Sequence, residues 1–200
     1  MEGIATFDRA SLKNVRTRVR TADGRQFFET RDTKGQPCAV SPPQLDEFPG
    51  FVPDLKPDLQ VGEVLPGLYI GSQDAAADWS LLESCGVTHV VNAAASTVPN
   101  FHEDRGVKYM AVEMLDVPDF ILSRATVDAV CDFIQGALSI GQSVFVHCNA
   151  GVSRSCALVL AFLMLRRGVS LREALEKTRS ARPSVCPNEG FLRQLAELQP

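Results

Sequence analysis

Apolar and polar residues form two different patterns along the chain from about Leu59 onward. Short apolar runs that are typical of buried strands occur in THVVNAAA (88–95), KYMAVEML (108–115) and SVFVHC (143–148). The stretch EVLPGLYIGS (63–72) predicts two further short strands around a Pro-Gly turn. We therefore expect a set of short, mostly buried strands in this part of the chain.

Segments with apolar residues at helical spacing lie between and after these strands. Val127, Val130 and Ile134 follow this spacing in a helix that we expect over 126–140. Strands that alternate with helices predict an α/β fold with a mostly parallel central sheet and helices on both faces. The other predicted helices cover 74–86 up to Gly86, 154–165, 171–181 behind a Ser170–Glu173 capping box, and 188–198 behind the cap Asn188.

The first 58 residues have a different texture. Basic residues are frequent from Arg9 to Arg25, here called the basic lead, and its stretch VRTRVRT predicts a short strand or an extended segment. Residues 36–58 hold six of the twelve prolines, so we expect no regular element to run through them. The chain should therefore divide into a partly disordered basic segment with a Pro-rich linker (1–58) and an α/β domain (59–200).

Composition narrows the class of protein. Two hundred residues that are 45% hydrophobic can bury one substantial core. The formal net charge is −4 and the pI is about 5.4. A chain with a net negative charge is not attracted as a whole to nucleic acid or to an acidic membrane, so neither is expected as a partner. The longest apolar run, Cys156 to Leu165, is ten residues long, about half of the ~20 that a membrane span needs.

Cysteine usage and the first residues bear on the compartment. The six cysteines show no CxxC pair or disulfide framework, so reduced thiols in the cytosol or nucleus are the simpler interpretation. The opening MEGIATFDRA has no apolar central region that would mark a secretory signal. We expect a cytoplasmic protein that can also be nuclear.

The stretch HCNAGVSRS (147–155) carries the candidate chemistry. Cys148 ends a predicted strand, Arg154 begins a predicted helix, and ligand sites of open α/β sheets lie beyond the carboxyl ends of their strands. A turn here aims backbone N–H groups and a helix N-terminus into one concavity that suits a phosphate dianion, and Gly151 allows close approach. Arg154 can bond two phosphate oxygens at once. The same N–H groups, helix N-terminus and arginine favour the thiolate form of Cys148. The thiolate would attack phosphorus and form a cysteinyl-phosphate, which water then cleaves.

This stretch resembles the signature loop of the cysteine-dependent protein phosphatases, specifically their dual-specificity branch. The resemblance runs from about Leu59 to Leu198 and includes LQVGEVLPGLYIGSQDAA, VTHVVNAA and ARPSVCPNEGF. It implies the phosphatase version of the α/β fold, with 59–200 as catalytic domain, and a reaction that needs no metal or other cofactor. No HExxH motif or carboxylate cluster at metal-ligand spacing is evident in the sequence.

The resemblance also assigns roles to residues. It makes Cys148 the nucleophile and Arg154 the phosphate clamp, while Ser155 stabilises the leaving thiolate when the intermediate breaks down. His147 would orient the loop, and Asn188 would cap a helix and brace the loop. The phosphate loop, defined here as residues 148–154, would bind substrate through Asn149, Ala150, Gly151, Val152, Ser153 and Arg154.

A general acid is implied about thirty residues before the nucleophile. The stretch EMLDVPDF offers Asp116, which lies 32 positions before Cys148, with Asp119 and Glu113 nearby. Such a group must hold a proton for the leaving oxygen and then accept one from water. Asp116 is the preferred candidate, although the local spacing alone does not separate it from the other two.

The resulting prediction is a protein phosphatase for phosphotyrosine and phosphoserine or phosphothreonine that acts on kinases of a mitogen- or stress-activated cascade. One alternative is a kinase scaffold with weak or dispensable catalysis that binds its partner through the basic lead. If the basic lead has no partner, it is simply a solvated segment. Another is a phosphatase for phosphoinositides or RNA 5′ phosphates, which would favour lysines in the loop where this chain has neutral residues. The remaining cysteines, His89 and His102 are predicted to be structural or exposed.

Overall fold

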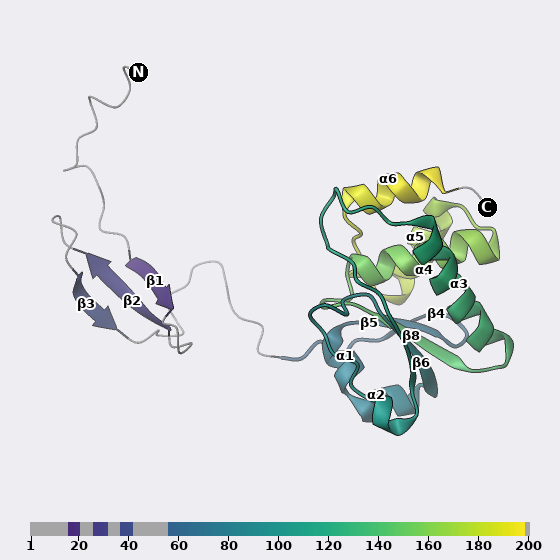
Figure 1. The fold of residues 1–200 in the computed structure, drawn as a ribbon, viewed down its shortest axis with the longest axis horizontal. Coiled ribbons are helices and arrows are strands. Elements are labelled where there is room, and N and C mark those ends of the chain that lie inside the picture. Colours follow the sequence, from purple (N-terminus) through teal and green to yellow (C-terminus); the bar gives the residue numbers. More distant parts are fainter. Residues whose placement is uncertain (1–15, 21–25, 32–36, 42–55, 199–200) are drawn as a thin grey trace, which may run out of the picture. The chain divides into compact units, whose positions relative to one another are not determined.

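The computed structural model describes residues 16–20, 26–31, 37–41 and 56–198. Contacts divide the chain into two units, Met1–Asp54 and Leu55–Pro200. The first unit holds a three-stranded antiparallel sheet in the order β1-β2-β3 (Figure 1). Its strands are β1 (Arg16–Arg20), β2 (Gln26–Arg31) and β3 (Pro37–Ser41).

Strand β3 corrects one expectation, because a regular element does enter the proline-rich stretch. Pro37 is the first residue of β3, and β3 lies at the edge of its sheet. The first residue of an edge strand is a place where a missing N–H costs no ladder hydrogen bond. Strand β1 decides between the two interpretations of VRTRVRT in favour of a strand. The disorder that we expected within 1–58 concerns positions outside the described residues.

The second unit is built on a five-stranded sheet in the order β4-β5-β8-β6-β7. Strands β4 and β5 pair antiparallel around the predicted Pro-Gly turn, and every other pair is parallel. The expected α/β fold with a mostly parallel sheet is therefore confirmed. The strands are β4 (Gly62–Leu65), β5 (Leu68–Gly71), β6 (Val87–Asn92), β7 (Lys108–Ala111) and β8 (Ser143–His147).

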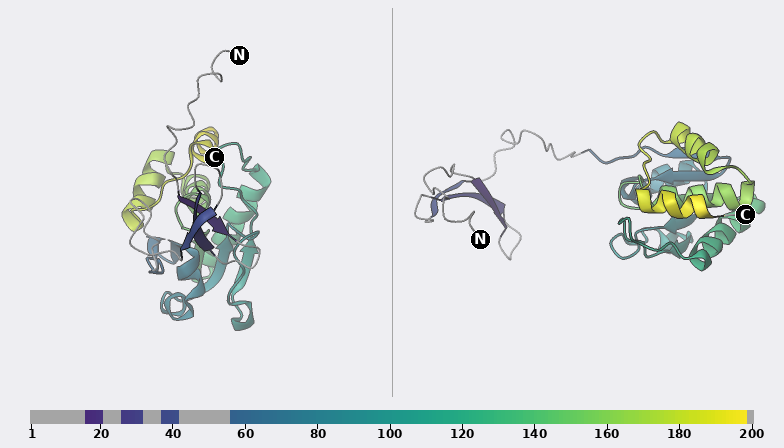
Figure 2. Two further views of the ribbon diagram at one scale, coloured as in Figure 1. Left: turned by 90° about the vertical axis from the view of Figure 1, so that its left-hand side faces the viewer. Right: turned by 90° about the horizontal axis from the view of Figure 1, so that it is seen from above.

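Helices cover both faces of this sheet (Figure 1). Val144 and Val146 of β8 pack in the larger core, under α3 and α4, whereas Phe145 packs in a smaller core with α1 and α2. Seen from above, α6 runs between α3 and α5 (Figure 2). In the described part of the chain, no helix is long and apolar enough to span a membrane. The helices are α1 (Gln73–Ala77), α2 (Trp79–Ser84), α3 (Arg124–Ser139), α4 (Arg154–Arg167), α5 (Leu171–Ala181) and α6 (Glu189–Glu197).

Two predicted elements differ from the structure. The single helix expected over 74–86 is broken at Asp78, whose backbone is extended and whose side chain accepts a hydrogen bond from Leu81 N at 3.0 Å to cap α2. Strand β7 was expected to be buried but is an edge strand with partly exposed residues. The capping box at Ser170 and the cap at Asn188 are confirmed.

Candidate active site

The phosphate loop joins the centre of the sheet to the most buried helix. Strand β8 lies between β5 and β6, and Cys148 follows it with only 1% of its surface exposed. Gly151 has φ +66°, and a Cβ at this position would lie 2.3 Å from the carbonyl oxygen of Gly71. Only glycine therefore fits where the loop crosses the end of β5. Gln73 N donates to Asn149 O at 2.8 Å and fixes the start of the loop.

Cys148 lies where an anion would be stabilised. Its Sγ is 3.4 Å from the hydroxyl oxygen of the buried Ser155, which can donate a hydrogen bond to a thiolate. The loop also ends at the N-terminus of α4, whose free N–H groups favour negative charge. By contrast, burial raises the pKa of Cys156 to about 12 and that of Cys131 to about 11. These two remain neutral thiols at pH 7 and are poor nucleophiles.

His147 is completely buried just before the nucleophile. Its Nδ1 lies 3.2 Å from the carbonyl oxygen of Cys148, which can only accept, so the hydrogen-bonded tautomer carries its proton on Nδ1. Its Nε2 is buried without a hydrogen-bond partner among the described residues. Burial lowers the pKa of His147 to about 4. The side chain is therefore neutral at pH 7 and adds no charge to the loop, and its role in orienting the loop stays a prediction.

Lowering the pH from 7 to 5 is expected to remove about 2 kcal/mol of unfolding free energy through His147 alone. The unfolded chain binds this proton near pH 6.5, whereas the folded protein binds it only near pH 4. The unfolded state therefore gains relative stability as the pH falls through that window. Urea unfolding at both pH values measures the loss, and a His147→Gln chain should lose less. Equal losses in the two chains would contradict this assignment.

Arg154 reaches from α4 across the mouth of the loop. Its side chain donates to Asn149 Oδ1 at 2.5 Å and to the carbonyl oxygen of Met114 at 3.4 Å. Its Nε is buried without a hydrogen-bond acceptor among the described residues and lies 3.9 Å from Asp116 Oδ2. Buried donors without an acceptor are costly, so this part of the guanidinium is suited to an incoming anion.

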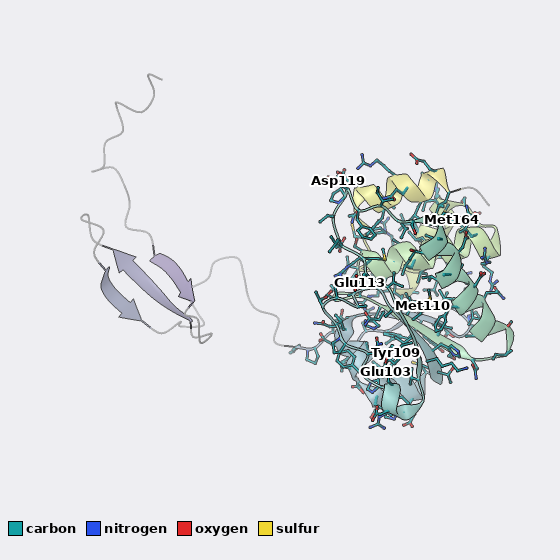
Figure 3. The ribbon with its side chains drawn as sticks, in the orientation of Figure 1. Glu103, Tyr109, Met110, Glu113, Asp119 and Met164 are labelled. Atoms are coloured by element: carbon teal, nitrogen blue, oxygen red, sulfur yellow. The ribbon has the colours of Figure 1, made fainter. Side chains whose placement is uncertain are left out.

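Asp116 lies against the phosphate loop from the segment between β7 and α3. Ser153 Oγ donates to its Oδ1 at 2.6 Å, and Asn188 Nδ2 donates to the same oxygen at 2.8 Å. Glu113 instead lines a groove between β7 and α3, and Asp119 is exposed beside α6 (Figure 3). Contacts with the loop thus favour Asp116 among the three carboxylates, and its role as general acid stays a prediction.

Asn188 joins three parts of the site. Its Oδ1 accepts from Phe191 N at 3.0 Å as the cap of α6, and its backbone N–H donates to Ser153 Oγ at 3.1 Å. Together with the bond to Asp116, these contacts tie α6 to both the phosphate loop and the candidate acid. The supporting role that the resemblance implies for Asn188 stays a prediction.

Arg182, which the sequence did not single out, holds the phosphate loop from behind. Its side chain is fully buried and donates to the carbonyl oxygens of Gly151 at 3.0 Å and Ala150 at 2.9 Å. It also donates to Gln60 O and pairs with the carboxylate of Asp58. Because the two loop carbonyls point at Arg182, the backbone N–H groups on the other side of these peptides are free to face a phosphate.

Asp58 extends this brace to the last residue of the predicted linker. Partial burial would raise the pKa of Asp58, but hydrogen bonds from Arg182 and from Gln60 N hold it below its ordinary value. Its carbonyl oxygen also accepts from Ser72 Oγ at 2.6 Å. The residues just before β4 are thus part of the support for the loop.

The site residues do not form a metal centre. In residues 56–198, no group of three or more histidine, cysteine, aspartate or glutamate side chains is placed to hold a metal ion. The chemistry available in the described residues is a thiol at the floor of an anion-binding loop, an arginine across it and a carboxylate at its edge. This set suits transfer of a phosphoryl group to sulfur.

Comparisons with known proteins agree with this geometry. The family described as "Dual specificity phosphatase, catalytic domain" matches residues 68–200. The chain is 38% identical to dual specificity protein phosphatase 19 of Mus musculus, over 98% of this chain and 88% of that protein. It is 46% identical to dual specificity protein phosphatase 26 of Homo sapiens, over 90% and 88%. The crystal structure of human tyrosine phosphatase-like serine/threonine/tyrosine-interacting protein matches with a TM-score of 0.63 at 31% identity, over 68% of this chain and 93% of that one. The chain therefore belongs to the dual-specificity protein phosphatase family, and it is a hydrolase of that class.

Proposed function

We propose that this protein dephosphorylates phosphotyrosine and phosphoserine or phosphothreonine through a phosphocysteine at Cys148, and that its substrates are kinases of a mitogen- or stress-activated cascade. The observation that carries the chemistry is the 3.4 Å contact of Cys148 Sγ with Ser155 Oγ. This contact lies inside a loop in which two backbone carbonyls accept hydrogen bonds from Arg182. A phosphate in this loop would have its phosphorus in front of the sulfur. We place the reaction in the cytoplasm and, for part of the protein, in the nucleus.

Two displacements at phosphorus complete the reaction. In the first, the Cys148 thiolate forms a P–S bond while the P–O bond to the substrate breaks, and Asp116 gives its proton to the leaving oxygen. In the second, water attacks phosphorus, Asp116 takes a proton from that water, and the P–S bond breaks. Ser155 donates to the departing thiolate, which restores the enzyme and releases inorganic phosphate. Arg154 stabilises the charge on the equatorial oxygens in both steps.

Two features of the sequence support kinases as the substrates. The sequence resembles phosphatases of kinase cascades, and β1 carries arginines at positions 16, 18 and 20. A basic segment of this kind complements an acidic groove on a partner protein. The neutral residues at positions 149, 150, 152 and 153 fit a phosphoprotein better than a highly charged lipid or RNA.

The test is hydrolysis by the full chain in EDTA of four substrates: a phosphotyrosine peptide, a phosphothreonine peptide, a phosphoinositide and an RNA 5′ phosphate. We expect turnover of both peptides and little of the other two. Rapid acid quenching during peptide turnover, followed by mass spectrometry, should find phosphate on the peptide that contains Cys148. Faster turnover of the lipid or the RNA would reject the proposed substrate class, and activity without a trapped phosphocysteine would reject the mechanism.

Asp116→Asn is expected to lower kcat/KM, which reports cleavage of the P–O bond, by about 10²–10³-fold for phosphothreonine but much less for p-nitrophenyl phosphate. The alkoxide of threonine leaves poorly without a proton, whereas the nitrophenolate is a good leaving group. Asp119→Asn is the matched control, and an equal or larger effect there would move the acid role to Asp119.

A scaffold with dispensable catalysis is the second candidate. It is favoured by the separate contact unit of Met1–Asp54, whose sheet includes the arginine-bearing β1. This function predicts that a Cys148→Ser chain keeps its effect on kinase signalling in cells while a chain lacking residues 1–54 loses it. The opposite pattern would favour the enzyme.

A further inference from the structure

Exposed apolar side chains are concentrated on the segment that carries Asp116. We call residues 113–122 the acid loop. Among the described residues, five large apolar side chains are exposed, and three of them lie on this loop: Leu115 at 61%, Val117 at 46% and Ile121 at 79%. Exposed apolar residues that gather in one place mark interaction sites more often than isolated ones do.

The acid loop is held in place, so this exposure is a property of a fixed surface. Gln194 of α6 donates to Phe120 O at 2.8 Å and accepts from Leu122 N at 2.7 Å. Phe120 packs edge-on against Phe191, with ring centroids 6.3 Å apart. A Cβ on Gly190 would lie 1.8 Å from the carbonyl oxygen of Pro118, which shows how closely α6 approaches the loop.

The position of the loop identifies what would cover it. Asp116 Oδ1 is 2.6 Å from Ser153 Oγ of the phosphate loop, so a substrate whose leaving oxygen faces Asp116 must pass beside the acid loop. Residues within two positions of the phosphoresidue lie at most about 7 Å from it along an extended chain. Leu115 and Val117 flank Asp116 directly. The neighbours of the phosphoresidue are thus the groups brought to this surface during every turnover.

Charge argues against a membrane at the same surface. The acid loop carries Glu113, Asp116 and Asp119 and no basic residue, and carboxylates are repelled by the anionic headgroups of the cytoplasmic leaflet. Figure 3 shows Glu113 and Asp119 on the acid loop, with Asp119 beside α6. An uncharged, apolar side chain of a peptide is the ligand that suits Leu115, Val117 and Ile121 best.

We propose that the acid loop selects phosphoprotein substrates that carry a large apolar residue within two positions of the phosphoresidue. This inference rests on the proposed function and adds to it a determinant of sequence preference at the same site. The apolar residue would pack on Leu115, Val117 and Ile121, outside the catalytic groups. The preference should therefore appear mainly in KM, because this contact forms when the peptide binds and does not change as the P–O bond breaks.

The test compares two phosphotyrosine peptides that differ only in having leucine or serine two positions before and two positions after the phosphotyrosine. For the wild-type full chain we expect kcat/KM to favour the leucine peptide by about tenfold. Ile121→Ser and Leu115→Ser should each lower this preference several-fold through KM. Hydrolysis of p-nitrophenyl phosphate, which has no flanking residues, should stay within about twofold of wild type in Ile121→Ser.

Ile140→Ser is the matched control. Ile140 is 68% exposed and lies between α3 and the amino end of β8, whereas Cys148 follows the carboxyl end of the same strand. The Ile140→Ser chain should keep the full preference for the leucine peptide.

Equal turnover of the two peptides by the wild type, or an unchanged preference in Ile121→Ser, would overturn the inference while hydrolysis of p-nitrophenyl phosphate still supported the enzyme. A wild type that hydrolyses none of the three substrates would overturn both. A dimer that Ile121→Ser disrupts, with the peptide preference intact, would assign the surface to a second copy of the chain and overturn this proposal.

Discussion

Cys148→Ser is expected to lower kcat for p-nitrophenyl phosphate by at least about 10⁴-fold. A serine hydroxyl stays protonated at neutral pH, and the anion-binding loop that favours a thiolate cannot make it a comparable nucleophile. The change replaces one buried atom, so the loop and its brace should keep their geometry. The steady-state rate in EDTA measures the loss.

Retained binding separates this result from misfolding. The Cys148→Ser chain should still bind a phosphotyrosine peptide in calorimetry, because Arg154 and the backbone N–H groups of the loop are unchanged. Cys186→Ser is the matched control, since Cys186 is exposed and contacts Val152 through its backbone N–H. Its rate should equal that of the wild type. Comparable activity in the Cys148→Ser chain would remove the thiol from the mechanism.

Features that depend on a short stretch of sequence were predictable. Strand β8, the turn after it and the start of α4 are consecutive, so the motif around Cys148 located the phosphate loop directly. The cap at Asn188 and the capping box at Ser170 are local in the same way. Asp116 could only be ranked above its neighbours, because its contact with Ser153 joins residues that lie 37 positions apart.

Features decided by tertiary packing could not be predicted. The helical pattern of residues 74–86 continues through Asp78, and nothing in it shows that the side chain caps a new helix there. Strand β7 has the apolar character of a buried strand, but its position at the sheet edge depends on the order of the strands. Arg182 was missed because a charged residue is expected to be solvent-exposed unless its partners are known, and its partners lie on two distant segments, residues 58–60 and residues 150–151.

Arg182→Met is expected to lower the unfolding free energy by about 3–5 kcal/mol and to weaken binding of inorganic phosphate about tenfold. Methionine fills much of the same volume but donates no hydrogen bond. The carbonyl oxygens of Ala150, Gly151 and Gln60 would lose their partner, and Asp58 would lose its counter-ion. Urea unfolding measures the first effect, and competitive inhibition by phosphate measures the second.

The two readouts distinguish a brace for the phosphate loop from a residue that only stabilises the fold. If Arg182 orients the loop, the Arg182→Met protein should show a raised KM for substrate and a raised inhibition constant for phosphate. Both constants are measured at a temperature where the variant is fully folded. Arg179→Met is the matched control, because Arg179 is an exposed arginine of α5, the helix that ends just before Arg182, and it should change neither quantity. Normal phosphate affinity in a destabilised Arg182→Met protein would show that the carbonyls of Ala150 and Gly151 keep their orientation without Arg182, and that the loop is positioned by α4 and Asn188 instead.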